Sequence, residues 1–160
     1  MQLTCQRASL TNAVQTVAAV APTRTTKDIL KNIKLIVSGG KATLIGTDSE
    51  IGMRCEVPDV IAEASGEALL PTTRVLSVLR ELSDDVVKLE VSSEAIWIRC
   101  GYSEFRLSAE DPADFPPVAV FEDNEYFVLP VASLRQQIRR TISQPIRRAR
   151  ATRWAAFKSS

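Results

Sequence analysis

The chain has 160 residues, which is long for one domain and short for two. It contains no histidine, and this excludes Ser-His-Asp and Cys-His catalysis, most zinc sites and the commonest general base. The 20 Lys and Arg residues nearly balance the 19 Asp and Glu residues, but residues 143–160 hold five of the basic residues and none of the acids.

The first half of the sequence predicts one helix followed by three strands. Residues 8–21 should form an amphipathic helix, because apolar side chains recur there at helical spacing. Residues 33–37 and 41–47 flank Gly39-Gly40, which is typical of a β-hairpin. A third strand is expected over 51–57, and residues 58–66 are expected to form a loop.

The second half repeats this order. A short strand at Leu69-Leu70 leads into a helix whose apolar face continues to Leu82. Residues 86–91 and 95–99 should pair, and the strand with Phe105 and Leu107 should follow a glycine-containing turn. Three prolines in 110–117 then end regular secondary structure. Residues 109–124 are therefore predicted to be a linker, called the seam here, between two units. A new strand should begin within 126–129. The predicted fold class is α+β, with helices on one face of a layer of antiparallel strands.

An internal repeat supports this organisation. The segments 3–10 and 127–134 both end in Ala-Ser-Leu, and a third strand-to-helix start lies at residue 69. Residues 1–120 should therefore consist of two strand-then-helix halves that share one core. We expect the helix residues of that core to be Leu10, Val14, Val17, Val75, Leu79 and Leu82.

The sequence predicts neither a membrane span nor a disulfide framework. Its longest purely apolar run is 17–21, whereas a membrane span needs about 20 such residues. Nothing near Met1 resembles a secretion signal. The odd number of cysteines, Cys5, Cys55 and Cys100, favours reduced core thiols. We therefore expect a cytoplasmic protein.

The charges are sorted by predicted element. Nearly all carboxylates fall on predicted strands and turns, whereas the predicted helices carry arginines against a single acid, Glu81. A charged helix face is usually just solvated, but such faces normally mix the two signs. Basic and neutral polar helix faces suit contact with phosphates, and without aromatic residues to stack on bases they favour duplex DNA. The helix arginines are Arg7, Arg74, Arg80, Arg135, Arg139 and Arg140.

Catalysis has one weak candidate. Asp48 and Glu50, together with Asp84-Asp85, could form a carboxylate cluster for metal ions. Both segments are also turn sequences, in which Asp and Ser cap backbone groups, and this is the better interpretation. The sequence therefore indicates a binding protein with no catalytic residue, no metal and no cofactor.

Three motifs together resemble the bacterial DNA polymerase III beta subunit, the replicative sliding clamp. They are residues 44–50 (Leu-Ile-Gly-Thr-Asp-Ser-Glu), 70–76 (Leu-Pro-Thr-Thr-Arg-Val-Leu), and Phe105-Arg-Leu-Ser with 112–116 (Pro-Ala-Asp-Phe-Pro). The resemblance implies a non-catalytic processivity factor with three similar domains per subunit. Two subunits join head to tail around duplex DNA, with helices lining the hole and sheets outside. It also implies binding to the replicative polymerase and the clamp loader, through a main pocket in domains beyond the match.

The resemblance also assigns residues. Arg24 matches a DNA-contacting arginine of the family, and Thr73 lies where the family can place a basic DNA-contacting residue, with Arg74 as a substitute. Arg7 and Arg80 are the further DNA candidates on the helices. The edge that meets the partner subunit would be the strand of Phe105 and Leu107, with Arg74 nearby. We expect this strand at a sheet edge, with Phe105 or Leu107 unusually exposed.

The resemblance covers residues 1–142 and divides the chain into three parts. Residues 1–120 correspond to the clamp's first domain, residues 121–142 to the start of a second, truncated domain, and residues 143–160 are a non-matching basic tail, expected to be disordered. Ring closure and a closed dimer are not expected of such a fragment, whose exposed apolar surface favours self-association. A frame shift would explain the tail. The alternative is a small nucleic-acid-binding protein that acts through this basic tail.

Overall fold

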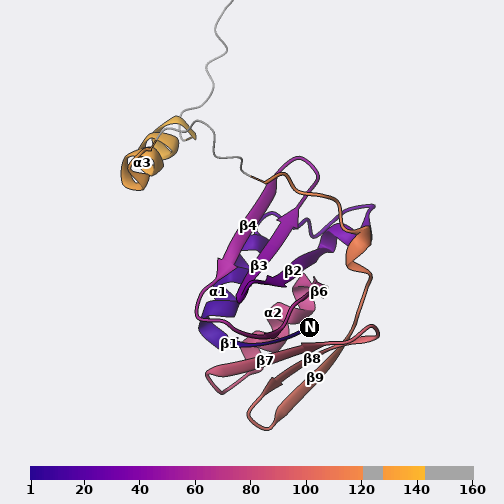
Figure 1. Ribbon diagram of the computed structural model, residues 1–160. Coiled ribbons are helices and arrows are strands. Elements are labelled where there is room, and N and C mark those ends of the chain that lie inside the picture. The colour runs from indigo at the N-terminus through magenta and orange to yellow at the C-terminus, as the bar shows by residue number, and fades with distance from the viewer. Residues whose placement is uncertain (121–127, 143–160) are drawn as a thin grey trace, which may run out of the picture. The chain divides into compact units, whose positions relative to one another are not determined.

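The computed structural model describes residues 1–120 and 128–142 (Figure 1). It divides into two compact units, Met1–Val120 and Phe121–Ser160, which are treated separately. The first half of unit 1 contains β1 (Gln2–Gln6), α1 (Arg7–Ala18), the 3-10 turn η1 (Asp28–Lys31), β2 (Asn32–Ser38), β3 (Lys41–Thr47), β4 (Gly52–Val57) and β5 (Ile61–Ala64). The second half contains β6 (Gly66–Pro71), α2 (Thr72–Glu81), β7 (Val86–Val91), β8 (Ala95–Cys100), β9 (Ser103–Ser108) and the 3-10 turn η2 (Pro112–Asp114).

The strands of unit 1 form two antiparallel sheets instead of the single layer expected from the sequence. One has the order β5-β1-β7-β8-β9 and the other β4-β3-β2-β6. β1 pairs with β7 of the second half, and β6 pairs with β2 of the first half. Each half therefore lends its opening strand to the sheet of the other half, which confirms the two strand-then-helix halves and the α+β class.

One core joins the two helices to both sheets. Its helix residues include all six expected from the sequence, and each is buried (Leu10, Val14, Val17, Val75, Leu79 and Leu82). Burial of such side chains contributes roughly 1.5–3 kcal/mol each. α1 and α2 also contact each other, so they lie on the same side of the sheets. At Gly46 the approach is so close that a Cβ would lie 2.6 Å from Cγ1 of Val17.

The hairpins follow the sequence closely, but three element boundaries differ from the prediction. β5 forms within the expected loop, where it pairs with β1 at the edge of the five-stranded sheet. α1 ends at Ala18, three residues before the expected Ala21. Of the strand expected over 126–129, residues 126 and 127 lie outside the described residues, and Val128 and Leu129 are not in a strand.

The seam after β9 is a packed strap rather than a plain break. Asp111 caps η2 by accepting a hydrogen bond from the Ala113 N–H at 2.9 Å. Phe115 is only 6% exposed and packs with Ile45 and Leu69 in a small second cluster. At its far end the Val118 carbonyl accepts a hydrogen bond from Arg54 on β4 at 2.8 Å. The strap thus runs from β9 across the four-stranded sheet to β4 (Figure 1).

The described part of unit 2 is α3 (Val131–Ile142) with the residues just before it. This helix lies where the repeat predicts one, and Leu134, Ile138 and Ile142 follow its apolar row and are exposed. Within the described ranges 1–120 and 128–142, no helix is long and apolar enough to cross a membrane.

Candidate nucleic-acid interface

The exposed side of α1 is polar and uncharged. Asn12, Gln15 and Thr16 are exposed, and the first turn of α1 holds no acid. The hydroxyls of Thr11 and Thr16 donate to carbonyls of their own helix, each at 2.7 Å. The donor hydrogens of these two hydroxyls are therefore used within the helix.

α2 and the loop after α1 supply positive charge beside this face. Thr73 and Arg74 are exposed in the first turn of α2, Arg80 is exposed in its last turn, and Arg24 is exposed in the loop. Within residues 1–120 and 128–142, Arg24, Arg74 and Arg80 have neither an ion pair nor a hydrogen bond. We define these three residues as the helix-side arginines.

Arg7 differs from the other candidates. Its backbone N–H donates to the Asp85 carbonyl at 2.7 Å, and its Nη2 lies 4.0 Å from the Asp85 carboxylate. Its Nε is buried without a hydrogen-bond partner. Arg7 is thus held at the junction between α1 and the turn after α2, and its role in DNA contact stays a prediction.

Four of the six cations on the strands of unit 1 are paired with carboxylates, whereas Arg54 donates to the Val118 carbonyl and Arg106 lies over the Trp97 ring. Lys34 lies 2.7 Å from Glu67, Lys41 lies 3.1 Å from Glu56, and Lys88 lies 3.5 Å from Glu63. Arg99 donates to Glu104 at 2.5 Å and also to Glu90, and these two carboxylates raise the pKa of its guanidinium. The sequence predicts that helix cations lack nearby acids and that sheet cations have them, and the ion pairs of the structure follow this difference for the helix-side arginines and for four of the sheet cations.

The strand of Phe105 and Leu107 lies at a sheet edge, as expected from the sequence. β9 is an edge strand of the five-stranded sheet. Phe105 is half-buried, but Leu107 is only 9% exposed, so the expected exposure is wrong for Leu107. An edge strand lacks a neighbour along one side only, and its inner face still packs on the core. Arg74 lies nearby, because it lines one cavity together with Ser108 at the end of β9.

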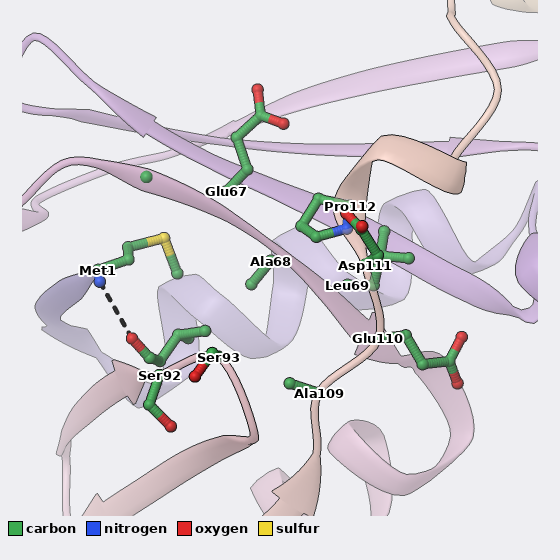
Figure 2. A pocket seen from close by; sticks show the side chains of 12 residues that line it. Met1, Glu67, Ala68, Leu69, Ser92, Ser93, Ala109, Glu110, Asp111 and Pro112 are labelled. Atoms are coloured by element: carbon green, nitrogen blue, oxygen red, sulfur yellow. Dashed lines mark hydrogen bonds between the residues drawn. The ribbon is translucent and has the colours of Figure 1, made fainter.

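The cavity in Figure 2 lies between the chain start, the β7–β8 turn and the start of the strap. The amino group of Met1 donates to the Val91 carbonyl at 3.1 Å. The three carboxylates that line this cavity already have partners: Glu67 pairs with Lys34, Glu110 accepts from Asn32 at 2.8 Å, and Asp111 caps η2. None of the predicted DNA residues lines it.

The weak metal candidate has a structural use. The carboxylate of Asp48 accepts hydrogen bonds from the N–H groups of Ile51 at 2.7 Å and Glu50 at 2.9 Å, and these bonds hold its pKa below the ordinary value. Among the described residues, no group of three His, Cys, Asp or Glu side chains could hold a metal ion.

One further cation joins the candidates. Lys27 is exposed in the same loop as Arg24, three positions later. Its position three residues after Arg24 in one short polar loop is visible in the sequence.

The comparisons with known proteins agree with this geometry. The sequence model described as DNA polymerase III beta subunit, N-terminal domain, matches residues 1–119. The beta sliding clamps of Pseudomonas aeruginosa and Escherichia coli K12 are 32% and 30% identical over 142 residues, which is 88% of this chain and 39% of theirs. The crystal structure of the Bacillus subtilis DNA polymerase sliding clamp superposes with a TM-score of 0.83 at 28% identity, over 87% of this chain and 39% of that one. The chain thus spans about two fifths of the length of these relatives. It belongs to the family of the DNA polymerase III beta subunit, the sliding clamp, through the N-terminal domain of that family.

Proposed function

We propose that this chain is part of a sliding clamp, a non-catalytic processivity factor that encircles duplex DNA and tethers the replicative polymerase in the cytoplasm. Residues 1–120 would be its first domain and residues 121–142 the start of its second. Membership of the family supports the proposal.

A single observation carries the DNA contact. The helix-side arginines have no acidic partner among the described residues, whereas Lys34, Lys41, Lys88 and Arg99 on the sheets each have one. A cation without a carboxylate partner keeps its full attraction for phosphate, and phosphate contacts carry no sequence information. The helix side would therefore face the duplex, with Arg24, Arg74 and Arg80 as contacts, Thr73 beside them, and Arg7 at the rim.

The proposed protein partners follow from the family. Head-to-tail contact with a second subunit would use the β9 edge with Phe105 and Leu107, and Arg74 beside it. The free edge of β9 and the half-buried Phe105 suit such a contact. Polymerase and clamp loader would bind to parts of the clamp beyond residues 1–120.

The alternative, a small nucleic-acid-binding protein that acts through the basic tail, is not favoured. Residues 143–160 lie outside the described residues, and the relatives match over 142 residues as clamps.

Duplex binding measured by fluorescence anisotropy decides between the two. The clamp proposal expects weak, sequence-independent and salt-sensitive binding that Arg24→Ala lowers and that deletion of residues 143–160 leaves largely intact. Lys41→Ala is the matched control, because it removes one charge that is already paired. Binding lost with the tail and unchanged by Arg24→Ala would overturn the proposal.

A further inference from the structure

One cavity at the start of α2 brings proposed DNA contacts together with two carboxylates. It has a volume of about 330 Å³ and is lined by residues of η1 and of the first turn of α2. Thr73 and Arg74 line it, and so do Asp28 and Glu110. An acid that paired with Arg74 would weaken the attraction of this arginine for phosphate. The availability of Arg74 therefore depends on which groups hold the two carboxylates.

Two consecutive residues, Lys31 and Asn32, hold these carboxylates. The Nζ of Lys31, at the end of η1, lies 2.6 Å from the Asp28 carboxylate. The hydrogen bond and the positive charge of Lys31 hold the pKa of Asp28 below its ordinary value. Asn32, the first residue of β2, is buried and donates from Nδ2 to Glu110 at 2.8 Å. Both acids of the cavity thus have partners other than Arg74.

The ion pair of Asp28 also leaves a second cation available. Lys27 directly precedes Asp28, is exposed, and has no ion pair in the part of the chain that the structure describes. Its backbone N–H donates to the Thr25 hydroxyl at 3.1 Å, which helps to fix the loop. Because Lys31 holds Asp28, the charge of Lys27 stays available to a phosphate, three residues after Arg24.

We propose that Lys31 is a positioning residue for DNA binding, because it engages the Asp28 carboxylate that would otherwise pair with Lys27 or Arg74. Lys27 then joins the helix-side arginines as a phosphate contact. Asn32 has the same role toward Glu110. The inference rests on the proposed DNA contact and adds the residues that keep its cations unpaired.

A direct phosphate contact by Lys31 is the competing explanation, and it has a different signature. A lysine that touches the duplex loses the same affinity on substitution whether or not Asp28 is charged. A lysine that acts through Asp28 matters only while this carboxylate carries its charge. A double-mutant cycle over the two residues separates these cases.

Duplex binding of the 160-residue chain, measured by fluorescence anisotropy at low salt, tests the proposal. Lys31→Ala should weaken binding by about twofold to fivefold, the range expected for one surface ion pair. Asp28→Asn should not weaken it. In the Asp28→Asn background, Lys31→Ala should change affinity little, because no carboxylate is left to release. Lys27→Ala should weaken binding in the same range as Lys31→Ala.

Lys41→Ala is the matched control. It also removes one positive charge and also releases one acid, Glu56, but on the sheets. It should leave duplex affinity unchanged. Lys31→Met gives a second reading that keeps the aliphatic stem, should Lys31→Ala disturb η1, and circular dichroism checks the fold of each variant.

Three results would overturn the proposal: an equal loss from Lys31→Ala in both backgrounds, no loss from Lys31→Ala or Lys31→Met, or an equal loss from Lys41→Ala. Arg24→Ala separates such a failure from a failure of the proposed function. If Arg24→Ala lowers duplex affinity and Lys31→Ala does not, the positioning role is wrong and the DNA contact stands. If Arg24→Ala has no effect, the DNA contact itself is contradicted.

Discussion

The helix side and the sheet side of unit 1 use the same cationic side chains in two ways. On the sheets, four of the six lysines and arginines pair with carboxylates, as Lys88 does with Glu63. On the helix side, Arg24, Arg74 and Arg80 have no such partner among the described residues. Because an unpaired cation keeps its full attraction for phosphate, the difference supports the proposal that the helix side faces DNA.

The helices and the sheets should share one core. The substitution Leu79→Ala tests this, and its expected effect is the largest of the predictions. Leu79 on α2 is fully buried in the shared core. Its truncation should lower the free energy of unfolding by about 2–5 kcal/mol, measured by urea denaturation. Ser77→Ala, on the exposed side of the same helix, should change stability little. A cost for Leu79→Ala as small as that of Ser77→Ala would mean that α2 does not pack on the sheets.

Gly46→Ala probes the distance between the two sides. The added Cβ would meet Cγ1 of Val17 at 2.6 Å and the Val17 carbonyl at 3.1 Å, so α1 must move away from β3. We expect a decrease of about 1–3 kcal/mol in the free energy of unfolding. An unchanged thermal midpoint would show that the helix does not approach the sheet this closely.

Unfolding at alkaline pH tests whether the Cys5 thiol is buried in the core between the helices and the sheets. Burial raises the pKa of the Cys5 thiol from 9.0 to about 11. The unfolded chain therefore loses this proton at lower pH than the folded chain, so stability is full below pH 9 and falls as the pH rises toward 11. The decrease from this group should be about 1.4 kcal/mol at about pH 10. Cys5→Ala should remove this component, whereas Cys55→Ser should retain it.

The smallest effect is expected for a paired sheet cation. Lys34→Ala removes the partner of Glu67 and should cost about 0.2–1 kcal/mol. It should not change duplex affinity measurably. A clear drop in affinity in this variant would mean that pairing does not distinguish the two sides.

Local pattern was enough to predict the hairpins and the core of both helices. Gly39-Gly40 marks the β2–β3 turn, and the apolar spacing of Leu10, Val14 and Val17 marks the buried side of α1. These features depend on residues close in sequence, and the repeat then relates the two halves.

Features that depend on distant residues were missed. Arg7 meets Asp85 only because α1 begins beside the turn after α2, which no local pattern encodes. β5 is short and exposed, and it forms because β1 offers an edge. Phe115 sits among prolines and acids, yet it is buried because the strap crosses Ile45 and Leu69.

The residues of the candidate site also fall into two groups, those predictable from local sequence and those that depend on distant residues. The resemblance located Arg24 and Thr73 by motif, and the sequence alone located the helix arginines by their lack of acidic neighbours. Neither could tell the unpaired Arg80 from the partly paired Arg7, because that depends on which carboxylates the fold brings within reach.

The most direct test of the account compares two matched triple variants in duplex binding at several salt concentrations. One carries Arg24→Ala, Arg74→Ala and Arg80→Ala, and the other carries Lys41→Ala, Lys88→Ala and Arg99→Ala, so both variants have three fewer positive charges than the unmodified chain. We expect the first to bind more weakly and to flatten the slope of log K against log salt by about 0.9 for each phosphate that is no longer neutralised, while the second behaves like the unmodified chain. Equal weakening in both triples would show that total charge, rather than the unpaired helix side, determines DNA binding, and would contradict the account.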